Sequence, residues 1–427
     1  MKLLAVTPLG RNREKSRLWI ESRRLEALGF PPGTPFSVEA KAGELLLRPA
    51  ILAENHVSSR RIAGGVRPII DVANQAYLGR LAAYPEVKIT GWHQRLQVSP
   101  TRRAAAILRS RNLTPPFRVL EVFAGGGTLS AAVTGNAAYT LTAGIEIDPR
   151  FADIWQAAHP DAALIQADIR AVETSDLPEF DILIGGIPCT SHSTLGRAKK
   201  GLAGKPELGD TGDLFLPVIG IVCERMPAAI LFENVPSFAT GLAGQLLTTH
   251  LERLGYHVFT AVLKPNAGWN EIEDRQRWLL VATLDRPFEL HPPGMTNTIS
   301  VSTFLDPQDP VRDQADAARI ARTIEGLRAH NARHQALGHG FGFTVLDGSE
   351  TKISVIPKCY HKINWGPFLR TPFGPRLLRL AELERIRGHR TPSSSCRTSI
   401  EILGQGVQPR LFREIAMQLS ATVSNWL

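Results

Sequence analysis

Runs of apolar residues recur along the middle of the chain, at intervals that leave room for a helix between them. The runs cover residues 118–123, 140–147, 180–186, 227–236 and 279–282. Short continuous apolar runs are typical of strands that are covered on both faces of a sheet. The pattern therefore predicts an α/β domain built on a mostly parallel, Rossmann-like sheet.

This strand and helix alternation stops after residue 284 and does not return before residue 370. The interval holds a Pro-rich segment at 291–294, a polar stretch at 308–331 and a Gly-rich segment at 339–343, which predict irregular structure around one polar helix. We therefore divide the chain into four parts: 1–115, 116–284, 285–370, and 371–427, whose motifs complete the central domain.

The first 115 residues contain an internal repeat. Residues 18–49 correspond without a gap to residues 69–100, at a constant offset of 51. The matched segments predict a strand, a short helix and a hairpin, used twice. They resemble the swapped-hairpin modules of AbrB and SymE-type proteins, which often bind DNA as two-fold barrels, so two fused copies would form one barrel within a single chain. The alternative is a basic β-rich domain that only packs on the rest of the chain.

Positive charge is concentrated in this repeat. The chain has a net charge of +9, while residues 1–115 carry 19 Lys and Arg against eight Asp and Glu. The excess favours a polyanionic partner. The four cysteines show neither metal-binding nor disulfide spacing, and the longest apolar run, 214–223, is too short to cross a membrane. We expect a cytosolic, nucleoid-associated protein without a metal or a membrane partner.

Polar residues follow the predicted strands at their carboxyl ends, where α/β enzymes bind ligands. The first strand runs into Gly125-Gly126-Gly127, the second ends at Glu146, and a third is closed by Asp168. Glycines let backbone amides approach a ligand, and an acid about twenty residues later can accept hydrogen bonds from ribose hydroxyls. The series suits an adenosine more than a dinucleotide.

A cysteine follows the strand at 180–186. Pro188 ends the strand and stiffens the backbone beside Cys189, whereas Glu233 ends a later strand and Arg275 and Arg277 precede the last one. On its own, such a cysteine is more commonly a small buried thiol. A thiol with a carboxylate and guanidinium groups nearby instead suits a polar planar substrate.

These motifs resemble, in order, those of the DNA (cytosine-5) methyltransferase family, over roughly residues 116–427. The similar segments are Phe123 to Gly127, Glu146, Asp168, Pro188-Cys189 with Ser193, 209–215, Glu233-Asn234-Val235, Arg275 with Arg277, 380–388 and 404–409. The resemblance implies a Rossmann-like S-adenosylmethionine-dependent domain, duplex DNA as the partner and a monomer. It also implies methyl transfer to C5 of a flipped-out cytosine through a cysteine adduct at C6.

The resemblance assigns a role to each matched residue. Cys189 supplies the thiolate, Glu233 contacts ring N3 and the exocyclic amine, and Arg277, beside Arg275, holds the O2 side. Residues 191–209 form the loop that closes over the base, and residues 285–370 read the target. The implied cofactor contacts are Phe123, Ala124, Gly125, Gly127, Thr128, Leu129, Glu146, Ile147, Asp168, Ile169, Pro188, Leu214, Gln405 and Val407.

Three positions depart from the family pattern. Glu273 stands where glutamine is usual, Gln405 where asparagine is usual, and His389-Arg390 where Phe-Pro is common. Two alternatives remain open: an RNA cytosine-5 methyltransferase, and a DNA-binding regulator whose catalytic half is degenerate. The intact Cys189, Glu233 and Arg277 argue against the second.

Overall fold

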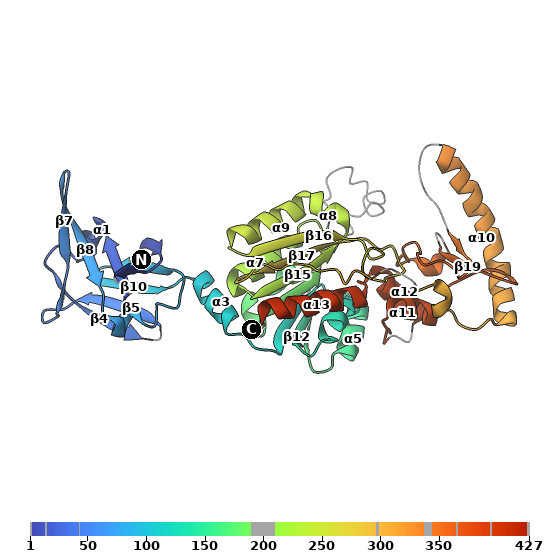
Figure 1. Cartoon of the computed structure of the whole chain (residues 1–427), viewed down its shortest axis with the longest axis horizontal. Helices are drawn as coiled ribbons and strands as arrows, with labels where there is room; N and C mark the ends of the chain where they lie inside the picture. Colours follow the sequence, from blue (N-terminus) through green and yellow to red (C-terminus); the bar gives the residue numbers. More distant parts are fainter. Residues whose placement is uncertain are drawn as a thin grey trace. The chain divides into compact units, whose positions relative to one another are not determined.

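The computed structural model forms two compact units, Met1–Asn112 and Leu113–Leu427 (Figure 1). The structure describes residues 2–12, 15–41, 43–188, 210–295, 299–336, 344–363, 366–392 and 395–424. Each unit has its own hydrophobic core. They are therefore described separately.

The N-terminal unit contains two sheets and short helices. One sheet has the order β1-β9-β10-β5-β4-β6 and the other the order β2-β3-β8-β7. The strands are β1 Lys2–Thr7, β2 Gly10–Asn12, β3 Lys15–Glu21, β4 Pro35–Lys41, β5 Glu44–Pro49, β6 Asn55–His56, β7 Ser58–Ile62, β8 Gly65–Val72, β9 Val87–Trp92 and β10 Arg95–Pro100. The helices are α1 Arg24–Ala27, α2 Gln75–Leu78 and α3 Arg102–Arg111.

Every element from β1 to β5 has a counterpart 51 residues later, between β6 and β10. Both strand orders read the same when the two copies are exchanged. Where the copies meet, β5 and β10 are antiparallel with Leu46 opposite Gln97, its own equivalent. The outer strands are swapped, because β1 of the first copy pairs with β9 of the second and β6 pairs with β4. The unit thus has an internal two-fold axis.

The larger unit is built on a seven-stranded sheet of order β13-β12-β11-β14-β15-β17-β16. The strands are β11 Phe117–Val122, β12 Tyr139–Glu146, β13 Ala163–Gln166, β14 Ile182–Gly186, β15 Ala229–Asn234, β16 His257–Leu263 and β17 Arg277–Thr283. Strands β11 to β15 are parallel, and β17 is antiparallel to both of its neighbours. The α/β fold predicted from the apolar runs is confirmed.

Helices cover both faces of this sheet, with α9 on one side and α13 on the other (Figure 1). The helices are α4 Thr128–Thr134, α5 Pro149–Ala158, α7 Phe215–Arg225, α8 Pro236–Thr240, α9 Leu242–Arg253 and α13 Pro409–Val423. Leu411, Phe412 and Ile415 of α13 belong to the same buried cluster as Leu129 of α4 and the sheet residue Val119. Burial of these apolar side chains stabilises the packing of the helices on the sheet, at about 25 cal/mol per Å² of apolar surface.

A smaller region contains the three strands β18 Val345–Leu346, β19 Phe368–Thr371 and β20 Gly374–Leu377. Its helices are α10 Pro310–Ala336, α11 Leu380–Arg387 and α12 Cys396–Gln405. Leu383 and Leu403 of α11 and α12 share a core with Val301, Leu346 and Ile353. The expected boundary at residue 370 therefore runs through a single hydrophobic cluster.

A buried arginine joins the helices of this region. Arg376 donates two hydrogen bonds to Glu382 of α11, at 2.8 and 2.7 Å, and its Nε lies 3.1 Å from Asp313 of α10. Arg379 also donates to Asp313, at 2.6 Å. Arg376, Glu382 and Asp313 are each at most 2% exposed. Removing one partner would strand a buried charge, so the cluster fixes how α10 begins beside β20 and α11.

Candidate active site

The carboxyl ends of four neighbouring parallel strands gather the residues that the sequence singles out. The strands lie in the order β12-β11-β14-β15, and they end at Glu146, Val122, Gly186 and Asn234. Because parallel strands end at a common edge, the loops that follow them are neighbours. The glycine loop, the Glu146 carboxylate, Pro188 and Glu233 therefore belong to one edge of the sheet.

The loop after β11 has an unusual backbone. Phe123 and Gly125 have positive φ angles of 56° and 54°, and Gly127, which precedes α4, has a φ of 78°. A Cβ added to Gly126 would lie 2.6 Å from Ile402 of α12. The loop therefore requires glycine both for its conformation and for its contact with α12. Ala124 and Leu129 on either side of the glycines are buried and anchor the loop in the core.

Glu146 stiffens this loop from β12. Its Oε2 accepts a hydrogen bond from the Gly125 amide at 2.7 Å, and its Oε1 accepts one from the Asp148 amide at 2.8 Å. Each carboxylate oxygen keeps lone-pair capacity for a further donor. The next side chain, Ile147, is 61% exposed. An acid with free acceptor capacity next to an exposed aliphatic side chain fits the ribose and base of a nucleoside.

A second buried carboxyl lies behind the loop. Glu121 of β11 accepts hydrogen bonds from the Ser130 amide at 3.1 Å and from the Trp155 indole at 2.7 Å. Burial raises the pKa of Glu121 to about 7, although both hydrogen bonds oppose the shift. Trp155 also fills the space beside Gly144, where a Cβ would lie 2.3 Å from the indole. The cluster ties the start of α4 to α5.

Asp168 is engaged by an arginine from the next turn. Its Oδ1 accepts from the Arg170 amide at 2.9 Å, and its Oδ2 lies 3.1 Å from the Arg170 guanidinium. Arg170 also pairs with Asp213 at 2.5 Å and lowers the pKa of that carboxyl. Arg170 thus links the third strand end to the segment before α7. The side chains of Ile169 and Leu214, which adjoin Arg170 and Asp213 in the sequence, are buried.

Glu233 and Arg277 form an ion pair between adjacent strands. Both side chains are 11% exposed, and Glu233 of β15 is opposite Gly186 of β14 in register. A Cβ on Gly186 would lie 3.3 Å from Glu233 Oε2. The carboxylate and the guanidinium therefore face the end of β14, two residues before Pro188. Cys189, Ser193 and the predicted closing loop lie outside the described residues.

Asn234 connects this pair to the nucleophile segment. Its Nδ2 donates to the Ile187 carbonyl at 3.0 Å, and its Oδ1 accepts from the Val235 amide at 2.8 Å. The side chain is 1% exposed. Asn234 thus fixes the backbone two residues before Cys189. The sequence motifs include it only as part of a triplet, although its position at a strand end was an available signal.

Arg275 differs from Arg277 in its surroundings. It is 3% exposed and donates to the carbonyls of Gly404 at 2.6 Å and Ile356 at 3.3 Å. Burial lowers its pKa from the ordinary arginine value. These contacts are with backbone groups, so the geometry favours a structural role over the catalytic role expected for it.

The turn after α12 closes on the glycine loop. The Val407 amide donates to Thr128 Oγ1 at 3.2 Å, and a Cβ on Gly406 would lie 2.4 Å from the same oxygen. Gln405 is exposed, whereas Val407 is 4% exposed. The Thr128 hydroxyl is therefore occupied by the turn. Its role in cofactor binding stays a prediction.

Two other kinds of site are absent from the described residues. None of the helices in the described ranges is both long enough and apolar enough to cross a bilayer. Within those same ranges, no cluster of three or more His, Cys, Asp or Glu side chains is placed to hold a metal ion.

Similar proteins agree with this geometry. A family model described as C-5 cytosine-specific DNA methylase matches residues 117–420. Type II methyltransferase M.NlaX of Neisseria lactamica is 27% identical over 323 residues, covering 72% of this chain and 97% of that protein. Type II methyltransferase M1.ScrFI of Lactococcus lactis subsp. cremoris is 25% identical over 283 residues, covering 60% and 67%.

The fold also has counterparts among solved structures. The crystal structure of S. pombe Dnmt2 methyltransferase has a TM-score of 0.58 at 17% identity, and the match covers 71% of this chain and 99% of that one. The Entamoeba histolytica methyltransferase EhMeth has the same TM-score at 15% identity. The Rossmann-like methyltransferase fold is therefore shown. The fold and the family match together show that the chain belongs to the C-5 cytosine-specific DNA methylase family. Members of this family methylate cytosine in DNA with S-adenosylmethionine as methyl donor.

Proposed function

We propose that the carboxyl edge formed by β11, β12, β14 and β15 is the active site, with Cys189 as its nucleophile. The observation that carries this proposal is the Glu233–Arg277 pair opposite the end of β14, two residues before Pro188. A planar base that enters there meets the Glu233 carboxylate, which can accept hydrogen bonds, beside the Arg277 guanidinium, which can donate them. This is the arrangement that holds a cytosine by its N3 edge and its O2 atom.

The covalent step uses groups of this chain. The Cys189 thiolate adds to C6 of the flipped cytosine, and the electron pair of the C5–C6 bond is pushed toward C5 and the ring. Glu233 accepts from the exocyclic amine and passes a proton to ring N3, which opposes the build-up of negative charge on the ring. The nucleophilic C5 takes up the methyl group and a base then removes the C5 proton. The electron pair of that C–H bond re-forms the C5–C6 double bond as the C6–S bond breaks and the thiolate is regenerated. Asn234 and Pro188 limit the motion of the backbone that carries the thiol.

The cofactor fits the loop and the acid. S-adenosylmethionine supplies an electrophilic methyl group when bound. Glu146 would accept from the ribose hydroxyls, and Ile147 would cover the adenine. The glycine loop would lie beside the methyl donor. Asp168 would contact the adenine, and Arg170, which donates to its Oδ2, would compete for the same carboxylate.

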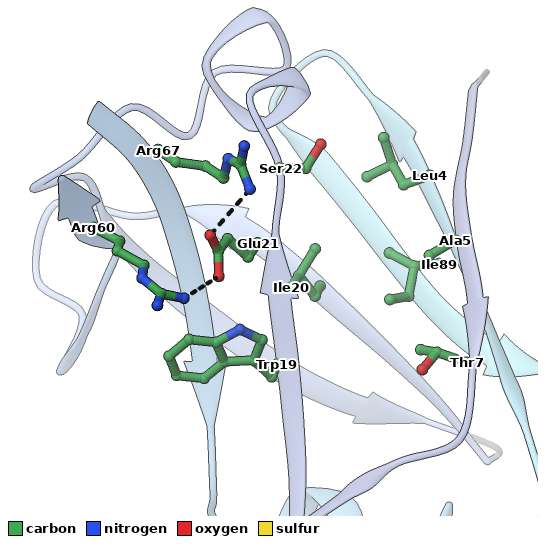
Figure 2. A pocket seen from close by; sticks show the side chains of 10 residues that line it. All are labelled: Leu4, Ala5, Thr7, Trp19, Ile20, Glu21, Ser22, Arg60, Arg67 and Ile89. Atoms are coloured by element: carbon green, nitrogen blue, oxygen red, sulfur yellow. Dashed lines mark hydrogen bonds and ion pairs between the residues drawn. The ribbon is translucent and has the colours of Figure 1, made fainter. Parts of the chain in front are cut away.

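The N-terminal unit is proposed to hold the DNA backbone. Figure 2 shows Arg60 and Arg67 converging on Glu21 beside Trp19. The two ion pairs measure 3.6 and 3.3 Å, and these residues line a cavity of about 500 Å³. Arg61, on the same hairpin as Arg60, is exposed. Such cations contact phosphates without reading sequence. Sequence reading is assigned to residues 285–370.

The test of the nucleophile is a matched pair of cysteine variants. Cys189→Ser should abolish methyl transfer and retain S-adenosylmethionine binding, because the hydroxyl is similar in size but far less nucleophilic. The control is Cys396→Ser, since Cys396 is exposed at the start of α12. A duplex containing 5-fluorocytosine should form a denaturation-resistant adduct with the wild type and the control alone. Normal turnover by the Cys189 variant would refute the assignment.

A further inference from the structure

A buried carboxylate organises the turn that closes on the glycine loop. Glu273 is 1% exposed, and glutamine is usual at its position in the family. Its Oε2 lies 3.0 Å from Arg387 Nε and its Oε1 lies 3.6 Å from Arg275 Nη1. Its Oε1 also accepts from the Ile356 amide at 2.9 Å. One negative charge is thus shared by two buried guanidinium groups.

Both guanidinium groups hold the backbone of one short segment. Arg387 donates to the carbonyls of Leu403 and Val407, the latter at 3.4 Å, while Arg275 donates to the carbonyl of Gly404 at 2.6 Å. We call residues 403–408 the closing turn. The Gln408 side chain adds a hydrogen bond to the Glu273 carbonyl at 3.0 Å. Four groups of the closing turn are therefore tied to residues 273, 275 and 387.

The closing turn in turn contacts the loop assigned to the cofactor. The Val407 amide donates to Thr128, and Gly406 has no room for a Cβ against that side chain. Ile402, one residue before the turn, is in contact with Gly126. A shift of the closing turn would therefore move the glycine loop directly. In close-packed interiors such strain is transmitted, because no void absorbs it.

We propose that Glu273 is a positioning residue for S-adenosylmethionine binding: its carboxylate balances Arg387 and Arg275, so that both can hold the closing turn against the glycine loop. A neutral glutamine could keep one hydrogen bond but could not balance two buried cations. The charge at Glu273 is thus matched to the arginine at 387. This inference rests on the proposed cofactor role of the glycine loop.

The test compares Glu273→Gln with the double variant Glu273→Gln/Arg387→Gln. The single change leaves a buried positive charge without its partner, so we expect S-adenosylmethionine to bind about tenfold more weakly. The double variant restores the net charge of the wild-type cluster but lacks the Arg387 hydrogen bonds to Leu403 and Val407. We therefore expect it to regain part of the lost affinity and to bind S-adenosylmethionine about threefold more tightly than the single variant. The affinity for duplex DNA and the kcat at saturating cofactor should change little in both. Direct cofactor binding and a titration of the KM give the two readouts.

The control is Glu271→Gln. Glu271 is also a buried carboxyl close to Arg387, but burial raises its pKa to about 7. At pH 6 it is largely protonated, so its replacement changes the charge little and should leave cofactor affinity near the wild-type value.

Two results would overturn the proposal: unchanged cofactor affinity in folded Glu273→Gln, or a double variant that binds more weakly than this single variant. If Glu273→Gln does not fold, recovery of folding and binding in the double variant supports the proposal, and failure of the double variant to fold refutes it. A wild-type protein that bound no S-adenosylmethionine would instead refute the proposed cofactor site.

Discussion

Asn234→Asp is the most informative single change outside the reacting groups. The two side chains have nearly the same shape, and the retained oxygen can still accept from the Val235 amide. The amide donor to Ile187, however, becomes a carboxylate oxygen 3.0 Å from a carbonyl oxygen. In a side chain that is 1% exposed, a lost and reversed hydrogen bond costs about 3 kcal/mol.

The strand pairing of β14 and β15 should survive this cost, so the strain falls on the segment that carries Cys189. If most of the ~3 kcal/mol appears in the barrier, kcat falls about 100-fold. The assay is transfer of a labelled methyl group to duplex DNA at saturating cofactor, together with thermal unfolding and cofactor affinity. Asn112→Asp is the control, because Asn112 donates in the same way to the Leu108 carbonyl at an exposed site. A folded Asn234→Asp enzyme with a kcat within twofold of the wild type would show that this bond does not position the nucleophile.

Two further predictions concern charge. Glu121→Gln should flatten the pH dependence of the unfolding free energy. The pKa of Glu121 is raised from 4.5 to about 7. The stability that its proton contributes is therefore complete below about pH 4.5 and is lost as the pH rises through about 7. In that window the unfolding free energy of the variant should decrease with pH less steeply than that of the wild type, by up to about 1.4 kcal/mol per pH unit. Equal slopes for the wild type and the variant would contradict the raised pKa of Glu121. Arg60→Ala/Arg61→Ala should lower the slope of log affinity against log salt by about 0.9 for each phosphate that is no longer neutralised, with the methylated sequence unchanged. An unchanged slope would mean that this hairpin does not touch DNA.

The strand ends could be predicted from the sequence because an apolar run that stops at a polar residue is a local signal. Val122, Glu146 and Asn234 end strands β11, β12 and β15 near where the runs stop. The repeat offset of 51 residues could also be found, since this requires only a comparison of the sequence with itself. The exchange of β1 and β6 between the copies was implied only by the resemblance to swapped-hairpin modules, because pairing between distant strands leaves no mark on periodicity.

The burial of each side chain was the other property that the sequence did not reveal. Arg275 and Arg277 are two residues apart and equally basic, so a motif treats them as a pair. In the structure only Arg277 reaches Glu233, while Arg275 donates to a carbonyl 129 residues away. Likewise Glu273 reads as a departure that weakens the site until Arg387, 114 positions later in the chain, is seen beside it. Such compensation depends on tertiary contacts alone.

The N-terminal unit shows what fusion of two copies makes possible. A two-fold unit built from identical chains must present the same surface twice. Here Trp19 is 41% exposed and Glu21 pairs with Arg60 and Arg67, whereas Ile70 and Val72, 51 residues later, lie in the core. The backbone symmetry is retained while the surface has diverged. A unit of this kind is not restricted to a symmetric partner, and it suits an enzyme that must act on one strand of a duplex at a time.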